Sequence, residues 1–268
     1  MRRWLLPILG PLAGIAFLIL GVKWLDRALR DTMRKDPRFL LSFDEIEVSG
    51  ASKGIDRRKF LAEVKQAGGF PDTLQLLDED LGDRINNAFA RHPWVEEVLR
   101  VETLSSHGLR VELLCRTPIL AVPQHGPTLA VDGKGILLPR EAANDALPIW
   151  RGSSSLPLGA PGTLWGDKDI EAAASVLGLL SSVDEQIHVR AAASRTGEIH
   201  LTTQDGSRII WGNPPGKEGK GEANAKDKLA FLVEYGAKHA GLEKPGGAHE
   251  FDLRPKEKPL VRLLRSGE

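Results

Sequence analysis

The sequence predicts an α+β protein: a single N-terminal transmembrane helix, then a domain with the order β-α-α-β-β, then a mostly antiparallel β domain with two helices. The first observation behind this prediction is a run of nineteen consecutive uncharged residues, 4–22. The second is a pair of amphipathic helical patterns followed by two strand patterns. The third is a change beyond Pro118 to short strands separated by turn residues.

Residues 4–24 are expected to cross a membrane. At about 1.5 Å per residue, a helix of this length approaches the roughly 30 Å of hydrocarbon in a bilayer, and Trp4 and Trp24 stand where interfacial anchors are common. A cleaved signal peptide is disfavoured because no small residues suited to cleavage end the run. A buried soluble helix is disfavoured because one core seldom surrounds a helix that is apolar on every face. Residues 1–3 would be a short tail and residues 25–40 a juxtamembrane stalk. Basic residues flank both ends, so charge leaves the orientation open.

The first domain is expected over residues 41–121. Phe60 and Val64 recur on one face of a helix that ends at a pair of glycines, and Pro93 ends a second helix. Two strands follow, so both helices are expected on one face of a small sheet. The expected helices begin at Asp56 and Asp78, and the expected strands cover residues 43–48, 95–104 and 109–114.

The second domain is expected over residues 122–264, followed by a tail of residues 265–268. Short apolar runs alternate with turn residues through most of this region, which is typical of antiparallel sheets. A segment rich in Gly, Lys and Glu, residues 213–226, is expected to be a mobile loop. The expected helices cover residues 169–180 and 228–239, and the expected strands cover residues 128–131, 136–138, 187–193, 199–203, 208–211, 251–253 and 260–264.

Composition and motifs argue against an enzyme and against a nucleic-acid-binding protein. The 36 basic and 36 acidic residues cancel, whereas nucleic-acid binding favours a basic excess. The single cysteine, Cys115, excludes a disulfide framework and a cysteine-based metal site. Lys217 and Lys220 follow glycines but precede neither Ser nor Thr, so they form no phosphate-binding loop motif. Neither H-E-x-x-H nor G-x-S-x-G occurs. We therefore expect no catalytic residue, no cofactor, no metal site and no small-molecule substrate.

Several motifs, taken in order along the chain, resemble the FtsQ/DivIB family of bacterial cell-division proteins. The most specific are HPWVEEVLRV at residues 92–101 and LRVELLCRTPILAV at residues 109–122. The second departs from the family, which usually has Glu in place of Cys115 and one residue fewer before Ala121. The other similar motifs are FDEIEVSGAS (43–52), LAVDGKGILLP (129–139), LTTQDGSRIIWGN (201–213), KDKLAFLVEY (226–235) and FDLRP (251–255).

The resemblance implies that residues 41–121 form a POTRA domain and residues 122–264 the β domain of the family. It implies a single-pass protein of the cell (inner) membrane at the division septum, with the N-terminus cytoplasmic and the bulk of the chain extracytoplasmic. The implied function is a non-enzymatic, membrane-anchored scaffold of the divisome that links early division proteins to the FtsB/FtsL pair and septal peptidoglycan synthesis. Two alternatives stay open: a POTRA-bearing component of another envelope assembly or secretion system, and a membrane-anchored cell-wall enzyme.

The last strand pattern is the predicted partner site. A final strand is a natural sheet edge, and an edge binds a partner by adding its strand through backbone hydrogen bonds. The resemblance implies that an FtsB segment docks after the D-L-R motif. The basic side chains of this region favour an acidic partner segment, and Pro255 and Pro259 limit pairing to residues 260–264. The alternative is that the strand merely closes the domain. The predicted partner-binding residues are Leu260, Val261, Arg262, Leu263, Leu264, Arg254 and Lys258.

Overall fold

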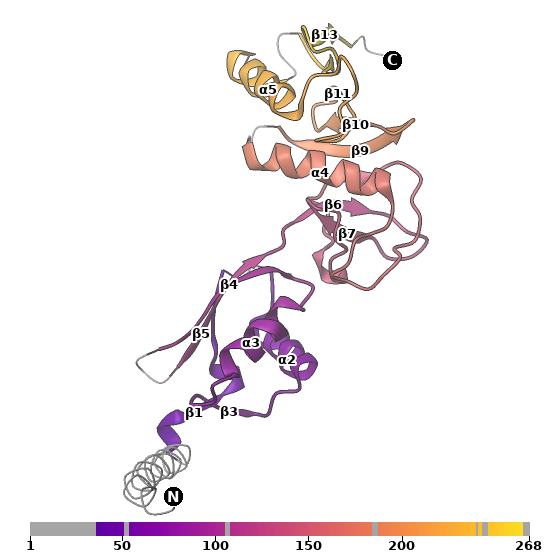
Figure 1. The fold of residues 1–268 in the computed structure, drawn as a ribbon. Helices are drawn as coiled ribbons and strands as arrows, with labels where there is room; N and C mark the ends of the chain where they lie inside the picture. Colours follow the sequence, from indigo (N-terminus) through magenta and orange to yellow (C-terminus); the bar gives the residue numbers. More distant parts are fainter. Residues whose placement is uncertain are drawn as a thin grey trace, which may run out of the picture. The chain divides into compact units, whose positions relative to one another are not determined.

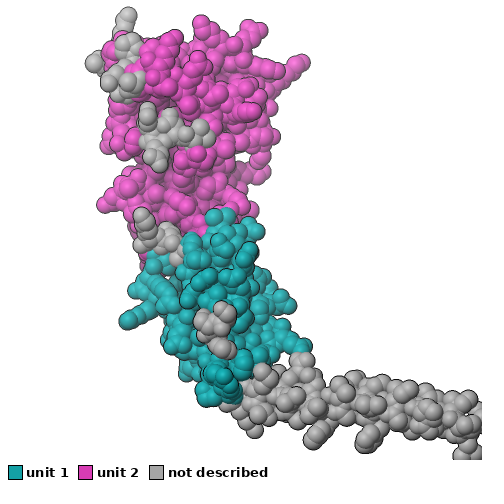
Figure 2. Space-filling model, turned by 90° about the vertical axis from the view of Figure 1, so that its left-hand side faces the viewer, with its two compact units in different colours: residues 1–51, 55–90, 97–114 teal, residues 52–54, 91–96, 115–268 magenta. Residues whose placement is uncertain are grey.

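The computed structural model describes residues 36–50, 54–104, 108–183, 187–239, 241–242 and 246–264. The chain forms two compact units, shown in teal and magenta in Figure 2. The first comprises residues 1–51, 55–90 and 97–114, and the second comprises residues 52–54, 91–96 and 115–268. Each has its own buried apolar side chains, such as Phe89 in the first unit and Trp211 in the second, both wholly buried.

The first unit is a small α+β domain. Its elements are η1 (Pro37–Phe39), β1 (Leu40–Ser42), η2 (Phe43–Glu45), β2 (Glu47–Ser49), α2 (Arg57–Gly68), β3 (Thr73–Gln75), α3 (Leu81–Ala90), β4 (Val95–Thr103) and β5 (Leu109–Cys115). The main sheet has the order β2-β5-β4, with β2 parallel to β5. Figure 1 shows α2 and α3 together on one side of this sheet. A separate two-stranded antiparallel sheet joins β1 to β3.

The boundaries of α2 follow from its capping residues. The Asp56 carboxylate accepts hydrogen bonds from the backbone N–H groups of Arg58 (2.8 Å) and Lys59 (3.1 Å), which satisfies two donors at the start of the helix. Gly69 ends the helix at a φ of 64°, in the left-handed region that favours glycine. The predicted start at Asp56 and the predicted glycine stop are confirmed.

The second unit is built on one eight-stranded sheet. Its elements are β6 (Pro118–Val122), β7 (Leu129–Asp132), η3 (Arg140–Ala142), β8 (Ile149–Trp150), α4 (Lys168–Val183), β9 (Val189–Arg195), β10 (Glu198–Thr203), β11 (Arg208–Gly212), α5 (Ala225–His239), β12 (His249–Asp252) and β13 (Leu260–Leu263). The strand order is β13-β12-β11-β10-β9-β8-β6-β7. Trp165, Trp211 and Phe251 belong to the buried core of the unit, together with the inner face of α4.

The fold class predicted from the sequence is wrong for the part of the chain that the structure describes. The eight-stranded sheet is mixed rather than mostly antiparallel, since β11 is parallel to β12, β8 to β9, and β6 to β8. For two of these pairs the reason is that α4 connects β8 to β9 and α5 connects β11 to β12, and a helical crossover allows parallel pairing. Between β6 and β8 the chain passes through β7 and η3. The first unit also departs from β-α-α-β-β, because β1 and β3 add two short strands.

None of the helices in the described ranges is long and apolar enough to cross a bilayer. The predicted tail (1–3), the predicted span (4–24), the first part of the predicted stalk (25–35) and the C-terminal tail (265–268) lie outside the described residues. The end of the predicted stalk forms η1 and the first residue of β1.

Candidate functional site: an open sheet edge

The eight-stranded sheet has two outer strands, β7 and β13, whose outer sides differ. On the outer side of β7, the backbone N–H of Leu138 donates to the carbonyl of Ala130 at 2.9 Å, and the N–H of Asp132 donates to the carbonyl of Ile136 at 3.1 Å. A returning segment therefore covers that edge. β13 pairs with β12, and no other strand in the described ranges pairs with it. β13 is thus the edge that can accept another strand.

The pairing of β13 with β12 is antiparallel and has a defined register. Arg262 lies opposite Glu250. Two positions further on, the backbone N–H of Leu264 donates to the carbonyl of Ala248 at 2.8 Å. This hydrogen bond continues the same register, so it marks one hydrogen-bonded pair of the ladder.

The position of that pair decides which backbone groups face outward. Hydrogen-bonded and non-hydrogen-bonded pairs alternate along an antiparallel ladder. Since the backbone N–H of Leu264 points toward β12, the backbone groups of Arg262 and Leu260, two and four positions earlier, point toward β12 as well. The N–H and C=O groups of Val261 and Leu263 therefore point to the open side of the sheet.

The side chains of β13 are exposed although most of them are apolar. Leu260 is 60% exposed, Val261 37% and Leu263 52%. Single exposed aliphatic residues are common on protein surfaces. Here Val261 and Leu263 share one face of the edge strand, beside its unpaired backbone groups, and Leu260 lies on the opposite face. Natural edge strands usually avoid this combination because it promotes pairing with other chains.

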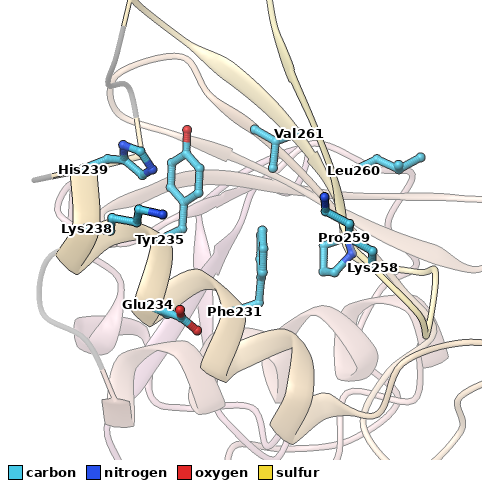
Figure 3. Close-up of a pocket in the computed structure, with 9 residues that line it drawn as sticks. All are labelled: Phe231, Glu234, Tyr235, Lys238, His239, Lys258, Pro259, Leu260 and Val261. Atoms are coloured by element: carbon cyan, nitrogen blue, oxygen red, sulfur yellow. The ribbon is translucent and has the colours of Figure 1, made fainter.

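A groove of about 540 Å³ lies between β13 and α5. In Figure 3 the rings of Phe231 and Tyr235 project from α5, and Val261 approaches them from β13. Ring contacts hold Tyr235 against Phe251 and His239, with centroid distances of 4.9 and 4.3 Å. Burial raises the pKa of Tyr235, so its hydroxyl stays protonated at neutral pH. The groove therefore offers an aromatic floor next to the open edge.

Charged side chains border this groove. Glu234, Lys238 and Lys258 line it, which leaves a small positive excess. Arg262 adds little to that excess, because its guanidinium lies 2.9 Å from the carboxylate of Glu250 on the neighbouring strand. Fewer basic side chains are therefore available to attract an acidic partner than the sequence suggests.

Arg254 is engaged within the chain rather than at the edge. Its Nε and Nη2 donate to the Asp252 carboxylate at 2.9 and 2.6 Å, and its Nη1 donates to Glu198 at 2.9 Å. The hydrogen bond to Asp252 raises the pKa of Arg254, and the same contact lowers the pKa of Asp252. This triad holds the turn after β12.

The structure brings most of the predicted partner-binding residues together. Residues 260–264 follow one another along the edge, and Lys258 lines the neighbouring groove. Arg254 lies apart, in the triad described above. Sequence reasoning missed Phe231 and Tyr235. Their spacing of four residues places them on one face of a helix, but ordinary core residues have the same spacing, so it does not single them out.

Comparison with protein-family models and with curated proteins finds no match for this chain. The resemblance to the FtsQ/DivIB family therefore rests on the sequence motifs alone. Among the residues that the structure describes, no group of three or more His, Cys, Asp or Glu side chains is placed to hold a metal ion. The site to be explained is the open edge of β13 with its aromatic groove.

Proposed function

We propose that this chain is a non-enzymatic scaffold of the bacterial division machinery, and that it binds an extended segment of an FtsB-like partner as an additional strand on β13. The observation that carries the proposal is the open edge. Val261 and Leu263 present backbone donors and acceptors outward, as the register with β12 requires. A partner strand would form its main-chain hydrogen bonds there and rest its apolar side chains in the groove.

The link to cell division comes from the sequence motifs. Their resemblance to the FtsQ/DivIB family supports a scaffold between early division proteins, the FtsB/FtsL pair and septal peptidoglycan synthesis. The proposed place at the cell membrane, with the bulk of the chain extracytoplasmic, rests on the uncharged residues 4–22, which lie outside the described ranges. Fractionation of cells tests it: recovery of the full chain in the soluble fraction would contradict that location.

Replacement of Val261 by proline tests strand addition. Proline removes one outward N–H, and it is tolerated on an edge where that N–H faces solvent. We expect the affinity of the full chain for an FtsB-like partner to fall about tenfold, which corresponds to about 1.4 kcal/mol. Titration calorimetry or surface plasmon resonance would measure the change.

The matched control is Val261→Thr, which keeps both the backbone N–H and the β-branched shape. It should bind within about twofold of the wild type. Arg262→Glu is unsuitable as a probe because it would set a second carboxylate opposite Glu250. Equal partner affinity for Val261→Pro and Val261→Thr would rule out strand addition at this edge. Absence of any binding by the wild type would favour another envelope assembly system.

A further inference from the structure

A buried ion pair joins α5 to the loop between β11 and α5. Lys228 of α5 has no exposed surface, and its Nζ lies 2.6 Å from Oε1 of Glu222 and 2.7 Å from the carbonyl oxygen of Trp211. Glu222 also accepts hydrogen bonds from the backbone N–H groups of Asn213 and Gly219, each at 2.8 Å. One carboxylate thus ties α5 to the start and the middle of the loop that the sequence predicts to be mobile.

The same loop holds the segment that leads into β13. An isolated antiparallel bridge pairs Glu222 with Pro255. The backbone N–H of Ala223 donates to the carbonyl of Arg254 at 2.9 Å, and the N–H of Lys256 donates to the carbonyl of Gly221 at 3.1 Å. The loop therefore holds the backbone of residues 254–256 in place through hydrogen bonds, a few positions before β13 begins.

The side chains of Glu222 and Arg254 both approach the backbone at Gly212. The φ of Gly212, +87°, lies in the left-handed region. A Cβ atom there would lie 2.3 Å from Oε1 of Glu222 and 2.8 Å from Cγ of Arg254. The side chains of Glu222 and Arg254 therefore pack against the same glycine. Because they share this contact, a shift of one side chain would displace the other.

We infer that the Lys228–Glu222 pair is a clamp that positions β13 for its partner. The pair fixes the loop, the loop fixes residues 254–256, and these residues set where β13 starts. Neither Lys228 nor Glu222 lines the groove, so both are positioning residues. The inference deepens the proposed function and rests on it for the binding role, although the positioning itself requires no partner.

The energetics of burial agree with a positioning role. Two buried charges lose their hydration, and an apolar pair of similar size is often as stable or more stable. The hydrogen bonds made by Glu222, in contrast, fix direction and distance for three separate chain segments. An apolar pair could fill the same space without holding the loop.

Hydrogen exchange in the full chain, without any partner, tests the clamp. The reporters are the amides of Arg262 and Leu264, which face β12. In the double variant Lys228→Met/Glu222→Leu we expect both amides to exchange about tenfold faster than in the wild type. Amides in the central strands β9 and β10 should change less, because the hydrogen bonds that are lost belong to the loop, α5 and Trp211.

The matched control is Lys59→Met/Glu63→Leu, the same two replacements at an exposed helical ion pair of the first unit. It should leave the exchange of β13 unchanged. Wild-type exchange at Arg262 and Leu264 in the clamp variant would overturn the inference. Equal acceleration in β9 and β10 would overturn it too, since the pair would then be a general stabiliser.

The clamp and the proposed function fail in different ways. If the clamp variant loosens β13 but the wild-type chain binds no FtsB-like partner, the positioning role stands and the proposed function falls. If the clamp variant keeps β13 protected and Val261→Pro still weakens binding, the proposed function stands and the clamp falls.

Discussion

Asp252 illustrates how single charges support the edge strand. It belongs to β12, and it shares the guanidinium of Arg254 with Glu198 from β10. Arg262 is likewise paired with Glu250. Basic residues that look available in the sequence are thus used within the chain, and Lys238 and Lys258 remain beside the groove.

The ion pair of Asp252 predicts a pH dependence of stability. Arg254 lowers the pKa of Asp252 in the folded chain, whereas the pKa in the unfolded chain is about 4. The stabilisation is therefore complete above about pH 5 and is lost as the pH falls through the folded pKa. We expect Asp252→Asn to lower the free energy of unfolding by about 1 kcal/mol at pH 7.

Denaturant unfolding at neutral and strongly acidic pH measures this contribution. The difference between wild type and Asp252→Asn should shrink at acidic pH, because both side chains are then uncharged. A difference of the same size at both pH values would mean that the carboxylate acts through its shape or its neutral hydrogen bonds instead of its charge.

At the scale of the element, β13 has two different sides. The backbone groups of Arg262 and Leu264 bond to β12, while those of Val261 and Leu263 face outward. Proline substitution distinguishes the two sides, since it deletes one N–H at a chosen position. The loss of stability caused by proline should therefore alternate from one residue of the strand to the next.

We expect Arg262→Pro to destabilise the second unit by about 1–3 kcal/mol, because it removes a donor to β12 and leaves a carbonyl of that strand unpaired. Val261→Pro should stay within about 0.5 kcal/mol of the wild type. Thermal unfolding followed by circular dichroism would compare the two variants. The reverse order of stability would show that the ladder has the opposite phase.

At the scale of the whole molecule, the sequence predicts local elements better than their pairing. The cap at Asp56 and the apolar stripe of Leu81, Ile85 and Phe89 can be read from neighbouring residues, and these three side chains are buried. Whether two strands run parallel depends on residues far apart in the chain. Strands of two or three residues, such as β1, β3 and β8, are too short to show a period of two.

In the candidate site, too, the sequence predicts the local element but not its long-range contacts. The short apolar run of residues 260–264 indicates a strand. The groove could not be predicted, because Phe231 and Tyr235 have the spacing of ordinary core residues. The role of the loop after Gly212 could not be predicted either. A composition rich in Gly, Lys and Glu is typical of a mobile loop, and nothing in it indicates that Glu222 forms a buried pair with Lys228.

Amide exchange at Val261 and Leu263, in the full chain with and without an FtsB-like partner, tests whether the partner adds as a strand to β13. The open edge predicts fast exchange of both amides in the free chain, while Arg262 and Leu264 are protected. Addition of the partner should then slow Val261 and Leu263 by about tenfold or more and leave Arg262 and Leu264 nearly unchanged. Protection of Val261 and Leu263 in the free chain would show that this edge is already covered, and partner binding without any change at these two amides would show that the partner does not pair with β13.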